Sequence, residues 1–107
     1  MKTSELTGAP LDWAVAKADG KRENDFGWWW DNYKPSTDWA QGGPIIEREN
    51  IGLWSEGYDW EAKIQIGSGQ WLAEWDEYPL IAAMRCYVAS KMGDEIEVPE
   101  DLNKEQA

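Results

Sequence analysis

The sequence predicts a single α+β domain in which two helices pack on a small antiparallel sheet. Residues 59–75 alternate apolar and polar side chains on either side of a Gly-Ser-Gly turn at 67–69, which is the pattern of a β-hairpin. Apolar residues recur at helical spacing over about residues 10–19 and 79–92. Because 107 residues is a common size for one domain, we expect residues 1–107 to fold together, with a frayed acidic tail over about 99–107.

Proline and glycine mark the ends of both predicted helices. Pro10 and Pro79 suit a first helical turn, whereas Gly20 and Gly93 are typical of the residue that follows a helix. We expect both helices to pack on the sheet, because each has an apolar stripe that needs a partner.

Two further regions, around residues 28–33 and 44–54, have the composition of short strands. Within the hairpin, Trp60 and Ile64 share one face by the two-residue period, and Trp71 and Trp75 share one face of the returning strand. If these two faces coincide, the three tryptophans cluster.

The charge balance disfavours two classes of partner. The chain has 10 Lys and Arg against 21 Asp and Glu, a net charge of −11, which opposes direct binding to nucleic acids and to anionic membranes. The acidic balance indicates either a solvated surface or a decoy that imitates DNA.

The cysteine count and the N-terminal residues bear on the compartment. With one cysteine, an internal disulfide is excluded. The N-terminal residues do not form the apolar segment that would indicate secretion. We therefore expect a cytosolic protein.

The absence of histidine argues against catalysis. It removes the commonest general base, the usual nucleophilic triads and most transition-metal sites. Cys86 follows Arg85 but has no histidine as a partner base, so we expect it to be a small buried hydrophobic residue. We expect no catalytic residue, no metal and no cofactor, and a binding protein rather than an enzyme.

The aromatic residues are unusually rich in tryptophan, with nine Trp and four Tyr against one Phe. A core of this size cannot easily hide nine indole rings, each of which needs a partner for its N–H. We expect several to remain partly exposed in a groove or at a subunit interface, which is consistent with a homo-oligomer.

The segment from Pro35 to Ile46 is the candidate binding loop. It is polar, it carries Trp39 at its centre, and Gly42 and Gly43 permit close approach of a ligand to the backbone. The alternative is a structural turn with Trp39 in the core. Downstream, Arg48 could hold an anionic group, or could pair with a neighbouring glutamate on the surface.

Four segments together resemble the NinX-like family of small proteins from tailed phages and enterobacterial prophages: KTSELTG (2–8), LDWAVAK (11–17), the run 35–49 and PLIAAMRCYVASK (79–91). The triple tryptophan Trp28-Trp29-Trp30 and the segment Asp76-Glu77-Tyr78 depart from the family pattern. The resemblance implies a phage protein that acts in the cytoplasm of the bacterial host, and it implies no reaction.

In that setting the leading hypothesis is a counter-defence protein that sequesters a small nucleotide-type immune signal. Trp39 and a ring of the triple tryptophan, Trp29, would stack on the base. The phosphate or ribose oxygens and the remaining polar groups would be contacted by Gly42, Gly43, Arg48, Arg85, Thr37, Asp38 and Gln41. The alternatives are an inhibitor that binds a host defence enzyme, through exposed tryptophans or DNA-like acids, and a structural phage protein without a ligand.

Overall fold

The computed structural model describes residues 1–21, 32–55, 57–100 and 102. Along the chain these residues form the 3-10 helix η1 (Thr3–Glu5), helices α1 (Gly8–Ala18) and α3 (Trp39–Glu49), strands β1 (Gly52–Ser55), β2 (Trp60–Gly67) and β3 (Gln70–Asp76), and helix α4 (Pro79–Met92). The predicted α+β class is confirmed.

Strands β1, β2 and β3 form an antiparallel sheet in that order, which confirms the predicted hairpin over 59–75. The alternation expected of a half-buried sheet holds along β2, where Ala62 and Ile64 are buried and Lys63 is exposed. The prediction of short strands within residues 44–54 is confirmed for the end of that region, where β1 lies.

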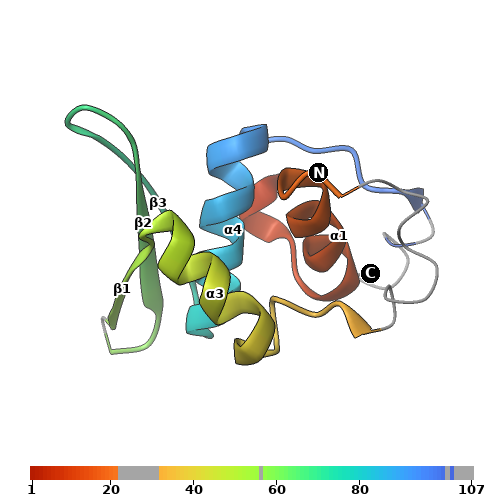
Figure 1. Ribbon diagram of the computed structural model, residues 1–107, viewed down its shortest axis with the longest axis horizontal. Helices are drawn as coiled ribbons and strands as arrows, with labels where there is room; N and C mark the ends of the chain where they lie inside the picture. The colour runs from red at the N-terminus through yellow and green to blue at the C-terminus, as the bar shows by residue number, and fades with distance from the viewer. Residues whose placement is uncertain (22–31, 56, 101, 103–107) are drawn as a thin grey trace.

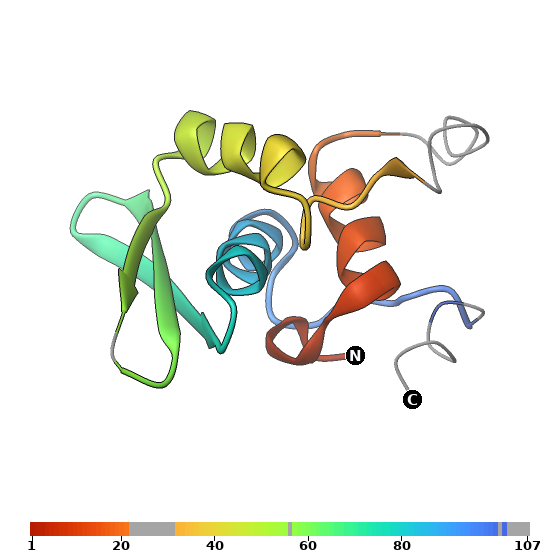
Figure 2. The same ribbon diagram turned by 90° about the horizontal axis from the view of Figure 1, so that it is seen from below.

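Helix α4 is the centre of the molecule. It lies between the inner face of the sheet on one side and α1 on the other (Figures 1 and 2). Its bounds agree with the predicted helix over 79–92, and residues 82–89 are all buried. A helix that is covered on every side needs small and apolar residues on every side, and the run of alanines, Met84 and Val88 supplies them.

Helix α1 confirms a helix near residues 10–19, but the expectation that it packs on the sheet is wrong. It packs on α4, on the side away from the sheet (Figure 2). The reason is that α4 already covers the inner face of β2 and β3, which leaves α1 to bury its apolar residues against the opposite side of that helix.

Helix α3 corrects two predictions, because it occupies much of the expected loop 35–46 and the first half of the strand region 44–54. Asp38 caps the helix by accepting a hydrogen bond from the Ala40 N–H at 3.0 Å, and Asn50 ends it in the left-handed region at φ 55°. Glycine and proline inside the helix disfavour it locally. Packing outweighs this preference, because Ile45 is only 4% exposed and Gly42 lies tightly against α4.

The strand predicted around 28–33 falls mostly on residues 28–31, which lie outside the described residues. Asn32 and Tyr33 belong to no strand. Trp29, which we expect to stack on the base of the ligand, also lies outside the part of the chain that the structure describes.

No helix formed by the described residues lies over the outer face of the sheet, as Figure 1 shows. Trp54 of β1 lies opposite Glu61 of β2, and Glu61 in turn lies opposite Trp75 of β3. Trp71 lies opposite Gln65 at the other end of the same face. The condition for a cluster of Trp60, Trp71 and Trp75 is not met. These pairings put Trp71 and Trp75 on the same face as Trp54, whereas Trp60 shares the opposite face with Ala62.

No helix among the described residues has the length and apolar character needed to cross a membrane.

Candidate functional site

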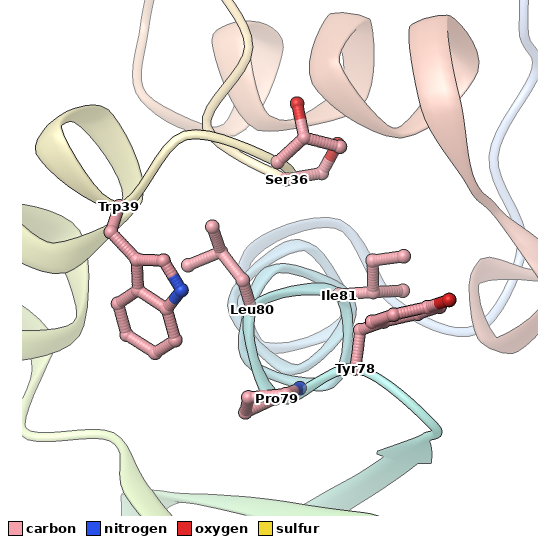
Figure 3. A pocket seen from close by; sticks show the side chains of 7 residues that line it. Ser36, Trp39, Tyr78, Pro79, Leu80 and Ile81 are labelled. Carbon is pink, nitrogen blue, oxygen red and sulfur yellow. The ribbon is translucent and has the colours of Figure 1, made fainter.

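A pocket opens where helices α3 and α4 begin. Its volume is about 320 Å³, at the lower end of the range for small-molecule sites. It is lined by Ser36, Thr37 and Trp39 from the start of α3, and by Tyr78, Pro79, Leu80 and Ile81 from the start of α4. Figure 3 shows the rings of Trp39 and Tyr78 on opposite sides of Leu80.

Trp39 is the first residue of α3, and the segment before it is held in place by hydrogen bonds. The Gln41 side chain accepts from the Lys34 N–H at 2.9 Å and donates to the Asn32 carbonyl at 2.7 Å and to Asp38 Oδ2 at 3.0 Å. These bonds occupy the side chains of Asp38 and Gln41 within the protein. They present Trp39 to solvent, with 52% of its surface exposed.

Tyr78 forms the opposite rim and immediately precedes α4. Its backbone N–H donates to Asp76 Oδ2 at 2.9 Å, and its side chain is 59% exposed. Pro79 follows as the first helical residue and has no N–H to donate. The N–H groups of Leu80 and Ile81 come next and, as first-turn groups, have no acceptor within the helix. This rim therefore combines an aromatic ring with the positive end of a helix dipole.

A buried carboxylate supports the pocket from behind. Asp12 of α1 is 6% exposed and its Oδ1 accepts a hydrogen bond from the Ser36 N–H at 2.9 Å. Burial raises the pKa of Asp12 to about 6, although the hydrogen bond from the Ser36 N–H and the charge of Lys34 act in the opposite direction. This contact ties the turn before α3 to α1 and so fixes one wall of the pocket.

Gly42 brings α3 close to α4. A Cβ atom at this position would collide with the carbonyl oxygen of Pro35 and with the side chain of Leu80, whereas a Cβ at Gly43 would meet nothing within 4 Å. The close backbone approach that the sequence suggested for Gly42 thus occurs, and its partners here are Pro35 and Leu80. It sets the spacing between the two halves of the pocket.

The two candidate arginines lie outside the pocket lining. Arg48 pairs with Asp19 at 2.8 Å and with Glu49 at 2.9 Å, and it donates to the Tyr87 hydroxyl at 3.2 Å. Arg85 is 7% exposed and donates to the Leu6 carbonyl at 2.8 Å.

Arg85 also donates to the Trp75 carbonyl at 2.9 Å and pairs with Asp76 at 3.0 Å. Asp76 in turn accepts a hydrogen bond from the Tyr78 N–H. Arg85 therefore helps to position Tyr78 at the rim of the pocket, with Asp76 as the link between them.

Of the residues predicted as a site, the structure brings Thr37 and Trp39 together at the pocket, with Gly42 behind them. Asp38 and Gln41 lie beside them in the capping network. The lining also includes Ser36 and residues 78–81, which the sequence did not single out as ligand contacts. The one signal for them was the aromatic-proline pair 78–79 before a strong helix.

The structure also gives Cys86 the expected buried position. The thiol is fully buried and lies 3.4 Å from the Leu72 carbonyl and 3.5 Å from the Ala62 carbonyl. Desolvation raises its pKa to about 12, so it is a poor nucleophile. No cluster of three metal-ligating side chains occurs among the described residues.

Fold and pocket together define a small acidic α+β protein with an aromatic pocket at converging helix ends and an uncovered, tryptophan-bearing sheet face. The family model described as Bacteriophage P22, NinX matches residues 2–91. The chain therefore belongs to the NinX family of phage proteins, and the match includes every residue that lines the pocket. A comparison with curated proteins gave no match.

Proposed function

We propose that the protein binds a small nucleotide-type ligand in the pocket between α3 and α4 and, as a phage protein in its bacterial host, withholds that ligand from a host defence pathway. The observation that carries the proposal is the exposed indole of Trp39 beside an apolar floor at Leu80, across from Tyr78. Aromatic side chains bind nucleobases by stacking, with little dependence on sequence.

The same pocket offers a place for the anionic part of such a ligand. The N–H groups of Leu80 and Ile81 lie at the positive end of α4, and helix N-termini favour phosphate oxygens. Thr37 adds a hydroxyl at the rim. These neutral groups replace Arg48 and Arg85 in the binding model, because both arginines are already paired within the protein.

Charge and size restrict the ligand further. With a net charge of −11, the protein repels highly charged anions at long range, so a ligand with one or two phosphates is favoured over one with three. A volume of about 320 Å³ suits a base with its sugar, while the phosphates would lie at the open rim.

The proposed mode of action is sequestration without chemistry. The chain has no histidine, and the Cys86 thiol is buried with a raised pKa. The pocket therefore has no histidine to act as a general base, and Cys86 cannot act there as a nucleophile.

Isothermal titration calorimetry with a panel of mononucleotides and cyclic dinucleotides tests the proposal, using Trp39→Ala and, as the matched control, Trp71→Ala on the sheet. Loss of a stacking ring should weaken binding by about 5- to 150-fold in the Trp39 variant only. Absence of binding across the panel, together with no co-purified small molecule in native mass spectrometry of protein from infected cells, would reject the proposal.

A second candidate function is inhibition of a host defence protein by direct contact. It is favoured by the outer face of the sheet, where Trp54, Trp71 and Trp75 are 67%, 58% and 47% exposed. Tryptophan is enriched at the centres of protein interfaces. Loss of host-enzyme inhibition in Trp71→Ala, with Trp39→Ala unaffected, would favour this function over sequestration.

A further inference from the structure

The outer face of the sheet is an organised surface. Three strands contribute to it, and their register places Trp54 and Trp75 on either side of Glu61. The side chain of Glu61 is only 14% exposed, although none of the helices that the structure describes covers this face. Its neighbours across the strands are the two indoles, because directly opposite residues in an antiparallel sheet lie side by side.

The charges on this face are balanced, in contrast to the rest of the chain. Glu61 and Lys63 follow each other on the face of β2, and their charged groups lie 3.8 Å apart. Their sum is zero, whereas the whole chain carries −11. Two copies of an acidic protein repel each other least where such a neutral face meets its own equivalent.

The face is also hollowed next to its tryptophans. A depression of about 440 Å³ is lined by Gly52, Leu53, Trp54, Glu61, Lys63 and Trp71. The row through its centre pairs Gly52 with Lys63, and Lys63 with Ala73, so small residues flank the lysine. In a twofold pair, the large rings of one copy can fit into the depression of the other copy, because the same surface carries both.

We propose that this outer face is the interface of a homodimer with a twofold axis, in which Glu61 of each copy faces Lys63 of the other. In a twofold interface the same patch serves both subunits, so one acid and one base side by side on a strand become two cross-subunit ion pairs. Trp54 and Trp75 of each copy then lie toward the end of the partner's face that holds Trp71.

The three exposed indoles supply about half of the area that each partner buries in a stable interface. At the observed exposures the three indoles leave roughly 400 Å² of mostly apolar surface in water, against about 800 Å² buried per partner in a stable interface. This inference does not depend on the proposed ligand, because the pocket and the outer face share no residue.

Sedimentation velocity over a range of concentrations, with circular dichroism to verify folding, tests the homodimer. The double variant Trp54→Ala/Trp71→Ala should sediment as a monomer, with a dimer dissociation constant raised more than tenfold. Trp39→Ala, at the pocket, should remain dimeric.

Charge reversal makes the test specific for the proposed pairing. Glu61→Lys and Lys63→Glu should each weaken the dimer, and the double exchange Glu61→Lys/Lys63→Glu should restore it. Glu61→Lys makes the chain less acidic overall, so a general charge effect would strengthen the dimer instead. A monomeric wild type, or a double exchange that folds but stays monomeric, would overturn the proposal, and so would capture of a different protein on this face by a monomeric wild type. None of these outcomes bears on nucleotide binding, which Trp39→Ala tests separately.

Discussion

Asp76 joins the buried guanidinium of Arg85 to the rim of the pocket. One carboxylate oxygen pairs with Arg85 at 3.0 Å, and the other accepts the Tyr78 N–H at 2.9 Å. The end of β3, the interior of α4 and the aromatic rim are therefore fixed by a single side chain.

Asp76→Ala should lower the free energy of unfolding by about 2–4 kcal/mol, because it leaves the Arg85 charge without its carboxylate partner in a mostly buried position. Asp76→Asn, which retains one acceptor, should lose less. Urea denaturation measures both, with Asp59→Ala at an exposed position as the control, expected within about 0.5 kcal/mol of wild type. Equal stability of Asp76→Ala and the control would show that the bridge contributes nothing.

Gly42 and Gly43 provide a matched pair within one helix. Gly42→Ala should destabilise the protein by about 1–3 kcal/mol, because its Cβ would collide with Pro35 and Leu80. Gly43→Ala should stabilise it by about 0.5–1 kcal/mol, because alanine is the better helix former and the added carbon meets no atom. Thermal denaturation of the two variants should give melting temperatures on opposite sides of the wild type; a Gly42→Ala variant that melts above wild type would contradict the close packing of α3 on α4.

Asp12 should make the protein less stable as the pH rises. Its pKa is about 6 in the folded state against 3.8 for the unperturbed group, so the native state binds the proton more tightly. The resulting stabilisation is present below about pH 4 and is lost as the pH rises through about 6. The difference amounts to about 3 kcal/mol, since each pKa unit corresponds to 1.36 kcal/mol.

Asp12→Asn isolates this effect from that of the other acids, because the amide oxygen can still accept the Ser36 N–H. Urea denaturation at a series of pH values should show the variant close to wild type near about pH 4 and more stable by up to about 3 kcal/mol near pH 7. A constant difference between the two proteins over this range would refute the raised pKa.

Cys86 should resist thiol reagents in the folded protein. With a pKa of about 12, about one thiol in ten thousand is ionised at pH 8, and its side chain is fully buried. Labelling with Ellman's reagent should be complete within minutes when guanidinium chloride unfolds the protein. Without the denaturant, labelling should be as slow as the opening of the native fold. Rapid labelling of the native protein would mean that the thiol is accessible.

The sequence predicted the elements whose local signals agree with their environment. The hairpin follows from alternation around Gly67–Gly69, and α4 follows from Pro79, helical spacing and Gly93. Helix α3 could not be predicted in this way, because Gly42, Gly43 and Pro44 disfavour a helix locally. What decides its conformation is the tertiary contact of Gly42 with α4.

The candidate site was predictable only in part for the same reason. Trp39 and Thr37 stand in a segment whose composition indicates binding, and both line the pocket. Tyr78 and Leu80 reach it from a position about 40 residues further along the chain, and local patterns carry no information on such a juxtaposition. Asp12 lies among the apolar residues of α1, and nothing in the sequence indicates that its carboxylate would be buried beside the pocket.

Helix α4 contacts the sheet, α1, α3 and η1, and its first turn is also the floor of the pocket. No layer can separate without uncovering this helix, so its central amides should be among the slowest to exchange with solvent, and opening should be global. A ligand held on the first turn of α4 would then stabilise the whole fold. At 100 times its dissociation constant it would add about 2.7 kcal/mol, which a melting-temperature screen of candidate ligands could detect.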